Sequence, residues 1–175
     1  FNLGKMYEYG EGVPQDYKTA LKWYRLATEQ GDAIAQTQVE ELQKKIADQN
    51  ELRELQARAK QGDAPAQFNL GLIYYAGKGV PQNYETAVKW FKLAVEQGNA
   101  DAQTNLGLMY HEGKGVPQND KTAVKWYRLA AEQGDADAQY NLGVMYDKGK
   151  GVPRDYKTAV KWYRLAAEQG IVVAQ

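Results

Sequence analysis

Apolar residues recur at intervals of three and four in two stretches of each segment of this chain, and that spacing places them on one face of an α-helix. The clearest examples occupy residues 64–76 and 84–96. The apolar positions are Ala66, Leu70, Ile73 and Tyr74 in the first stretch, and Ala87, Trp90, Phe91 and Ala94 in the second. Each stretch therefore predicts a helix with one buried stripe.

Polar and helix-breaking residues delimit these two helices. Asp63 follows a glycine and precedes an alanine-rich run, as expected for an N-cap whose side chain accepts hydrogen bonds from free backbone N–H groups. Gly77 and Gly79 end the first helix near Ala76, and Pro81 can lead into the second helix but cannot continue the first. The expected N-caps of the second helices are Asp16, Asn83, Asn119 and Asp155, and their expected stops are Gly31, Gly98, Gly134 and Gly170.

The helix pair repeats with a period of 36 residues. A shift by this period superposes Gly71 on Gly107 and Gly143, and it keeps the loop prolines and the tryptophans in phase. Such a period is typical of a solenoid, in which each unit buries its apolar face on its neighbours. The predicted fold class is therefore all-α, a solenoid of antiparallel helix pairs. The predicted units are 1–36, 37–67, 68–103, 104–139 and 140–175, and the second of them has only 31 residues.

Composition excludes several kinds of chemistry. The chain has no cysteine, one histidine and no serine, which excludes thiol and serine nucleophiles, a disulfide framework and cysteine-based zinc sites. His111 has no second histidine or cysteine to share a metal, so we expect neither a metal site nor a cofactor. The loop Gly77–Gly79 lacks the spacing of a phosphate-binding loop and is explained by turn formation.

Charge and hydropathy also bear on the partners. Lys and Arg number 22 and Asp and Glu number 22, so no field of one sign attracts nucleic acid or an anionic membrane. The recurring Lys-Trp-Tyr-Arg segment interleaves basic and aromatic residues, but packing already accounts for its tryptophan. No apolar run approaches the length of a membrane span. We therefore expect neither a nucleic acid nor a membrane as partner.

The pattern A-x-A-Q-x-N-L-G-x-x-Y-x-x-G-x-G-V-P-x-x-Y-x-x-A-x-x-W-Y-x-x-A-x-x-x-G runs from Ala136 to Gly170, and it recurs with small changes at 64–98 and 100–134. It resembles the Sel-one-like repeat family, helical repeats related to tetratricopeptide repeats, and the resemblance covers the four full units. It implies a right-handed superhelix whose first helices line a concave side. It further implies a non-catalytic adaptor that binds a protein or peptide, as such repeats do in bacterial signalling, envelope assembly and host contact.

Two positions depart from the family pattern. Asp120 stands where the other full units have tyrosine, and we expect it to loosen one contact between repeats. Residues 171–173 replace the usual Asp-Ala-x entry and remove an N-cap, so no normal helix is expected after Gly170 in isolation.

The short second unit admits two interpretations. Residues 36–61 contain neither Gly nor Pro, so this segment can form one long helix. However, the six-residue step from Ile46 to Leu52 interrupts the helical alternation, and Asp48 with Glu51 has the spacing of a capping box. We therefore expect a break near residues 48–50. Residues 38–49 would form the polar-faced end of one array, and residues 50–62 the beginning of another.

The two ends of the chain are in phase with the repeat. Ala174 and Gln175 match the Ala-Gln dipeptide that precedes the other full units, and Phe1 matches the first residue of such a unit. One hypothesis is a homo-oligomer in which Gln175 of one molecule stacks on Phe1 of another, or in which the 37–67 unit lets the first repeat fold back. The alternative is a stretch of a longer array. The absence of cysteine is compatible with the bacterial cytoplasm and with a periplasmic or secreted protein.

The first helix of each unit varies at three positions with the spacing i, i+4 and i+7, which lie on one face, whereas the second helix hardly varies. A face that is not needed for packing within the protein and that carries Phe, Tyr and Leu is typical of a partner-binding groove, since aromatic anchors dominate interface energies. The alternative is unconstrained surface or packing between repeats. The expected partner-binding residues are Phe68, Leu72, Tyr75, Thr104, Leu108, His111, Tyr140, Val144 and Asp147, with Phe1, Lys5 and Glu8 equivalent to them in the first unit.

Two other functions compete with this protein-binding interpretation. One is a weak β-lactam-binding or hydrolytic enzyme, as described for some members of the family, although no Thr, Asp or Glu nucleophile stands in a recognisable constellation. The other is a structural protein that assembles head to tail through open solenoid ends. We favour the non-catalytic scaffold, with no catalytic residue.

Overall fold

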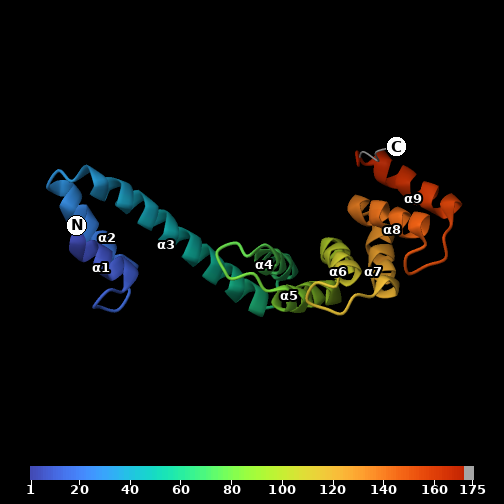
Figure 1. The fold of residues 1–175 in the computed structure, drawn as a ribbon, viewed down its shortest axis with the longest axis horizontal. Helices are drawn as coiled ribbons and strands as arrows, with labels where there is room; N and C mark the ends of the chain where they lie inside the picture. Colours follow the sequence, from blue (N-terminus) through green and yellow to red (C-terminus); the bar gives the residue numbers. More distant parts are fainter. Residues whose placement is uncertain (172–175) are drawn as a thin grey trace. The chain divides into compact units, whose positions relative to one another are not determined.

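The computed structural model describes residues 1–171, which form nine α-helices joined by short loops (Figure 1). The helices are α1 (Asn2–Tyr9), α2 (Tyr17–Glu29), α3 (Ala33–Lys60), α4 (Ala64–Ala76), α5 (Tyr84–Glu96), α6 (Ala100–Glu112), α7 (Asp120–Glu132), α8 (Ala136–Lys148) and α9 (Tyr156–Glu168). The predicted all-α solenoid of helix pairs is confirmed. The replaced repeat entry at 172–173 and the proposed stacking of Gln175 lie outside the described residues.

Four helix pairs form the full repeats: α1 with α2, α4 with α5, α6 with α7, and α8 with α9. In the second half of the chain each second helix also packs on the first helix of the following repeat, as α5 does on α6 and α7 on α8. The buried core accordingly lies between successive pairs rather than at one centre.

The predicted helix ends are confirmed by the side chains that cap them. Asp63 Oδ1 accepts a hydrogen bond from the Ala66 N–H at 3.0 Å, and Asn83 Oδ1 accepts one from the Thr86 N–H at 2.8 Å. The first helix of the pair ends at Gly77, whose φ of 71° is the left-handed conformation that glycine adopts without strain. Equivalent side-chain caps are made by Asp16, Asn99, Asn119, Asp135 and Asp155.

A glycine inside each first helix lets the second helix approach closely. A Cβ atom built on Gly107 would lie 2.7 Å from two ring carbons of Tyr127, which is closer than packed carbon atoms approach. Phe91 occupies the same place against Gly71. The helix-propensity cost of a mid-helix glycine, about 1 kcal/mol, is therefore offset by burial of an aromatic ring.

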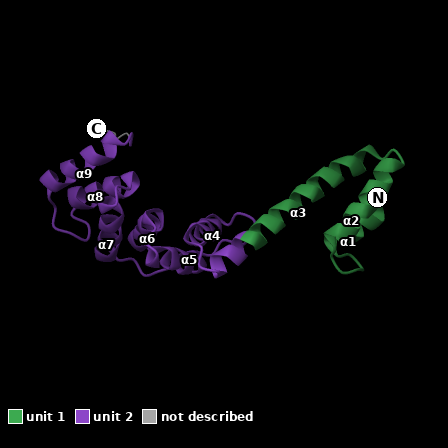
Figure 2. Ribbon diagram, turned by 180° about the vertical axis from the view of Figure 1, so that it is seen from behind, with its two compact units in different colours: residues 1–54 green, residues 55–175 purple. Residues whose placement is uncertain are grey.

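The expected break near residues 48–50 is wrong, because α3 runs without interruption from Ala33 to Lys60 (Figure 2). Its backbone contains no residue that resists the helical conformation, and an uninterrupted helix gains one backbone hydrogen bond for each residue added. A capping-box spacing marks the beginning of a helix only where the N-cap residue leaves the helical conformation. Here Asp48 is simply an exposed residue on a continuing helix.

The chain divides into two compact units, 1–54 and 55–175, and α3 contributes to both (Figure 2). In the first unit Val39 and Leu42 of α3 are buried against Ala20 and Tyr24 of α2. In the second unit Ala59 is buried near the end of α3, and its carbonyl accepts a hydrogen bond from the Gln67 side chain at 3.1 Å. One helix thus closes the core of the first unit and begins that of the second.

The middle of α3 is strongly polar and mostly exposed. Within residues 1–171, no helix combines the length and the apolar character that crossing a bilayer requires.

Candidate protein-binding surface

The three variable positions of each first helix differ in what they contact. In α4 they are Phe68, Leu72 and Tyr75, all half-buried. The equivalent residues are Phe1, Lys5 and Glu8 in the first repeat, Thr104, Leu108 and His111 in α6, and Tyr140, Val144 and Asp147 in α8. We call these the first, second and third variable positions.

The first variable position packs on the aromatic residue at the centre of its own repeat. Phe68 lies 5.9 Å from Phe91 between ring centroids, and Tyr140 lies 5.7 Å from Tyr163, both tilted. Phe1 makes the same contact with Tyr24 at 5.5 Å.

Thr104 is the exception among the first variable positions, because it is buried and polar. Its hydroxyl group contacts the carbonyl of Ala100 at 3.1 Å and the carboxylate of Asp135, the cap of α8, at 2.9 Å. Thr104 therefore joins consecutive repeats and does not present its side chain to a partner.

The third variable position contacts the beginning of the second helix. Tyr75 packs on Tyr84 with ring centroids 5.4 Å apart, and His111 Nδ1 lies 2.6 Å from Asp120 Oδ1. Asp120 therefore replaces a ring contact by a hydrogen bond, which is why the departure from tyrosine at this position accompanies a histidine at 111. Asp147 instead pairs with the exposed Lys148 at 3.2 Å.

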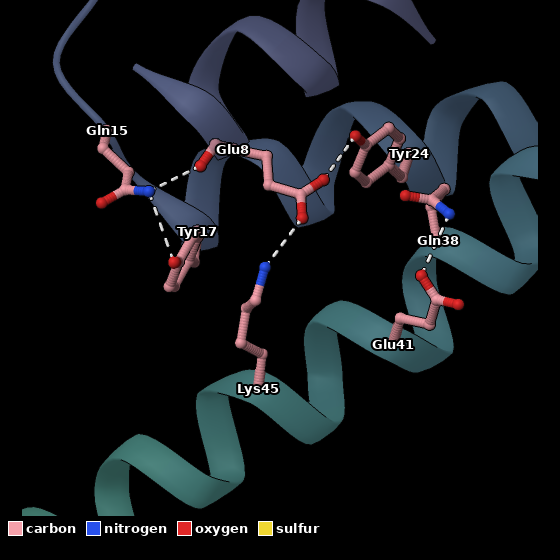
Figure 3. A network of polar contacts seen from close by, with 7 residues as sticks. All are labelled: Glu8, Gln15, Tyr17, Tyr24, Gln38, Glu41 and Lys45. Carbon is pink, nitrogen blue, oxygen red and sulfur yellow. Dashed lines mark hydrogen bonds and ion pairs between the residues drawn. The ribbon is translucent and has the colours of Figure 1, made fainter. Parts of the chain in front are cut away.

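In the first repeat the third variable position, Glu8, is buried and bridges three helices (Figure 3). Its carboxylate accepts hydrogen bonds from the Tyr24 hydroxyl at 2.8 Å and from Lys45 Nζ of α3 at 3.1 Å. Burial, together with the hydrogen bond to Glu8, raises the pKa of Tyr24, and the same carboxylate raises the pKa of Lys45. Glu8 is therefore a structural residue in this unit.

The identity of the third variable position varies together with that of the central aromatic residue of the same repeat. Where this position is Tyr75, the central aromatic residue is Phe91, which has no hydroxyl group. Where the position is charged or polar, the central residue is a tyrosine, and in the first repeat Glu8 accepts a hydrogen bond from the hydroxyl of Tyr24. The interpretation that these positions make no packing contacts is wrong for the first variable positions and, among the third, for Glu8, Tyr75 and His111, because helical spacing does not reveal the groups opposite.

The second variable position is the least engaged of the three. Leu72 is half-buried at the edge of the cluster formed by α5 and α6, and Leu108 and Val144 are half-buried in the same register. Lys5 is exposed, with Nζ 4.9 Å from the centre of the Phe1 ring. A partner would therefore meet the second positions directly and the first positions along one edge.

Sequence reasoning missed Lys114, which lies in the Gly-Lys-Gly loop after α6. Its ammonium group lies 5.3 Å from the centre of the Tyr75 ring and 5.5 Å from that of Tyr84, and it donates to the Tyr75 hydroxyl at 3.2 Å. It also pairs with Glu112 at 2.8 Å. The recurrence of a lysine between the two loop glycines was the available signal, but the aromatic pair belongs to the preceding repeat.

The described residues contain no group of three or more His, Asp or Glu side chains that could hold a metal ion. His111 has a single carboxylate neighbour and belongs to the row of variable positions. What the arrangement supplies is a periodic series of half-buried apolar side chains supported from below by fixed aromatic rings.

The Sel1 repeat model matches residues 1–32, 64–99, 100–135 and 136–171. The chain belongs to the Sel1 repeat family. Proteins of this family are generally non-catalytic scaffolds for protein interactions. The matches begin and end where the helix pairs do and leave out the segment that α3 occupies.

Among solved structures, the chain is similar to c5321, a protective antigen present in uropathogenic Escherichia coli strains, at 41% identity and a TM-score of 0.61. That similarity covers 97% of this chain and 30% of that protein, so the chain spans less than a third of its length. A Sel1 repeat protein from Oxalobacter formigenes is 42% identical over 69% of this chain and 90% of its own, with a TM-score of 0.62.

A more distant structure shares the fold alone. Helicobacter pylori cysteine-rich protein B is 24% identical over 68% of this chain and 90% of its own, with a TM-score of 0.54. No curated protein matches the chain. The solved neighbours named here are bacterial, which fits the bacterial source expected from the repeat pattern.

Proposed function

We propose that this chain is a non-catalytic scaffold that binds a protein or peptide along α4, α6 and α8. The surface consists of the second variable positions Leu72, Leu108 and Val144, flanked by Phe68 and Tyr140. We call it the variable surface. Asp147 lines its other edge together with His111 and Tyr75, and the last two would tune specificity through their contacts with Asp120 and Tyr84 at the start of the second helices.

The observation that supports this proposal is the combination of partial exposure and fixed position. Phe68 and Tyr140 are half-buried, and each is held by a ring contact shorter than 6 Å. A side chain that is already immobilised loses little conformational entropy when a partner binds. Aromatic residues held in this way are typical anchors of protein interfaces.

The spacing of the surface also favours an extended or helical peptide. One apolar second position is presented by each of three successive repeats, at residues 72, 108 and 144. A ligand that contacts all three is bound by repeated weak contacts rather than by one pocket. The variable surface therefore fits a segment with several apolar side chains better than a small molecule, which needs a deep cavity.

The test begins with peptides selected from a random displayed library on the immobilised 175-residue chain. Binding of the selected peptides is then measured by fluorescence anisotropy to the chain and to a triple variant, Leu72→Glu, Leu108→Glu and Val144→Glu. Three half-exposed sites tolerate glutamate, so the circular dichroism spectrum should be retained. We expect the peptide Kd to rise at least about tenfold.

The matched control uses exposed leucines of the second helices, with the changes Leu93→Glu and Leu129→Glu. These add the same kind of charge to the opposite helices of the same repeats, and peptide binding should stay unchanged. If the control pair abolishes binding while the triple variant does not, the binding surface lies on the second helices. Tyr75→Ala is a poorer probe, because it also removes the contacts with Tyr84 and Lys114.

A further inference from the structure

The long helix α3 combines the two helices of a repeat without the loop that joins them elsewhere. Its beginning has the register of a first helix, because Asp32 accepts a hydrogen bond from the Ala35 N–H at 3.1 Å, as Asp63 caps the start of α4. Its end has the register of a second helix, because Gly62 follows it with a φ of 94° and Gly98 follows α5 with a φ of 80°. The first match requires a shift of 31 residues and the second a shift of 36, so α3 lacks five residues of the loop.

The missing loop prevents the two parts of α3 from packing on each other. In a full repeat the loop turns the chain back, so that the second helix packs on the first, as α5 does on α4. We call residues 33–46 the first half of α3 and residues 48–60 its second half. The two halves follow one axis, so positions 36 and 61 lie about 37 Å apart. When the loop of a helix pair is lost, the same contacts form only by exchange between two molecules.

The contacts that α3 makes within its own chain leave one face free. Val39 and Leu42 pack on α2 and are buried. The neighbouring Glu40 is exposed, although this position is a glycine against an aromatic ring in the other four first helices. The ring position in the second half of α3 is Leu55, so a larger side chain on one half accompanies a smaller one on the other. The sizes of the two halves therefore remain complementary at this contact.

A pair of glutamines provides the template for the contact. In the second unit the glutamine after each second helix donates to the glutamine at the fourth position of the first helix, at 2.8 to 2.9 Å. The donors are Gln97, Gln133 and Gln169, and the acceptors are Gln67, Gln103 and Gln139. The equivalent residues of α3 are Gln61 and Gln36. Both are exposed, and Gln36 donates instead to Glu40 of its own helix at 2.8 Å.

A second template lies near the middle of α3. In the full repeats the third variable position meets the first residue of the second helix, as His111 Nδ1 meets Asp120 Oδ1 at 2.6 Å. The equivalent residues of α3 are Lys44 and Asp48, which are exposed and carry opposite charges. Two α3 helices that run antiparallel place Lys44 of one copy opposite Asp48 of the other.

Other charges on the free face follow the same antiparallel order. Glu40 replaces a glycine of the full repeats, and Glu51 and Arg58 replace two alanines that face the first helix. Along the first half the sequence of charges is Glu40 and then Lys44, and along the second half it is Glu51 and then Arg58. An antiparallel pair sets Glu40 opposite Arg58 and Lys44 opposite Glu51, so unlike charges meet. Arg58 also pairs with Asp63 of its own chain at 2.7 Å, which holds its side chain in place.

We infer that two copies of this chain associate through α3, with the first half of each helix packed on the second half of the other. Each copy thereby supplies the helix that the missing loop withholds from its partner. Gln36 would bond to Gln61, and Lys44 would pair with Asp48, each contact occurring twice about a two-fold axis. Such an interface joins the same surface of both copies, so association stops at the dimer.

The first experiment measures the mass of the 175-residue chain by sedimentation across a wide concentration range. The mass of one chain is 19.7 kDa, and we expect the weight-average mass to rise to twice this value and no further. A variant in which residues 77–83 are inserted in place of Ile46 and Ala47 regains the loop. Its two halves can pair within one chain, so it should have the mass of a single chain and retain its helicity.

Thiol cross-linking tests the antiparallel geometry, because the chain has no cysteine of its own. Gln36→Cys and Gln61→Cys are made in separate chains and mixed in a glutathione redox buffer. The mixture should form covalent dimers of unlike chains, since the two positions face each other. Either variant alone serves as the matched control and should form few, because its two thiols lie about 37 Å apart along the paired helices and a disulfide spans less than about 7 Å between Cα atoms.

A charge change tests the central contact. Lys44→Glu should raise the Kd of the dimer at least about tenfold, because it faces Asp48 and Glu51 of the other copy. Lys60→Glu is the control with the same change of charge on the same helix, at a position where the second helices of the full repeats carry glutamate. It should leave the Kd unchanged.

Three results would overturn the inference. The first is the mass of a single chain at every concentration, and the second is a dimer that persists in the variant with the restored loop. The third is cross-linking of either single-cysteine variant as efficient as that of the mixture. Peptide binding at the variable surface uses α4, α6 and α8 and does not depend on these results.

Discussion

The close contact between Gly107 and Tyr127 leads to a prediction whose sign is opposite to that expected from helix propensity. In an exposed helix interior, replacing glycine by alanine stabilises the protein by about 1 kcal/mol. In α6 the added methyl group of Gly107→Ala would lie 2.7 Å from both Cδ1 and Cε1 of Tyr127. One or both helices must therefore move.

The size of the change in the free energy of unfolding depends on how little the Tyr127 ring can move. Tyr127 is among the largest fully buried side chains, so it cannot rotate into solvent. Inserting a methyl group into a tightly packed core costs about 1–3 kcal/mol, and a fully enclosed ring places the cost in the upper part of that range. After the propensity gain is subtracted, we expect Gly107→Ala to lower the free energy of unfolding by about 1–2 kcal/mol.

Urea unfolding monitored by circular dichroism measures this change, and a double-mutant cycle identifies its cause. Tyr127→Ala removes the ring, so Gly107→Ala added to that variant should stabilise the protein instead of destabilising it. The reversal of sign is the diagnostic result. If Gly107→Ala raises the stability of the unmodified chain by about 1 kcal/mol, the ring contact does not limit the approach of the helices and the reasoning fails.

Three further predictions concern other elements. Lys45→Ala leaves the buried Glu8 carboxylate with only the Tyr24 hydroxyl as partner, so urea unfolding at neutral pH should show a loss of about 1–2 kcal/mol that Lys45→Arg largely avoids. Hydrogen bonds, first of all from Thr158, hold the pKa of Asp155 below its ordinary value, so its stabilising effect is present above about pH 4 and is lost as the pH falls through the lower folded-state pKa. Asp155→Asn should therefore reduce the decrease in melting temperature between about pH 5 and pH 2, and a decrease equal to that of the original chain would contradict this. Asn50→Pro should cost about 3 kcal/mol and remove the hydrogen-exchange protection of the middle of α3, whereas a chain already broken at this point would tolerate it.

The helix pairs and their ends could be predicted from the sequence because their causes are local. A capping side chain bonds to a backbone N–H group two or three residues away, and a glycine with positive φ ends a helix regardless of what surrounds it. The same holds for the loops, where proline and two glycines leave few conformations open. The 36-residue period then made the solenoid predictable, since identical units bury identical faces.

The candidate surface was only partly predictable. Periodicity places Phe68, Leu72 and Tyr75 on one face of α4, but it could not show that Phe68 packs on Phe91 or that Tyr75 packs on Tyr84 and Lys114. These contacts join residues that are 9, 23 and 39 positions apart in the sequence. Comparing repeats within the chain therefore reveals which positions vary, and the structure alone shows that several vary together with the residue that they contact.

The sequence by itself determined the repeat, the helix pair, the caps and the absence of cysteine and serine chemistry, because each depends on residue type and short-range spacing. Tertiary structure decided two other matters, the role of Glu8 within a buried network and the packing of Tyr75 on Tyr84. In each of these the free energy depends on which group faces the residue from another helix. Helical spacing specifies the face on which a side chain lies, and packing specifies what that face meets.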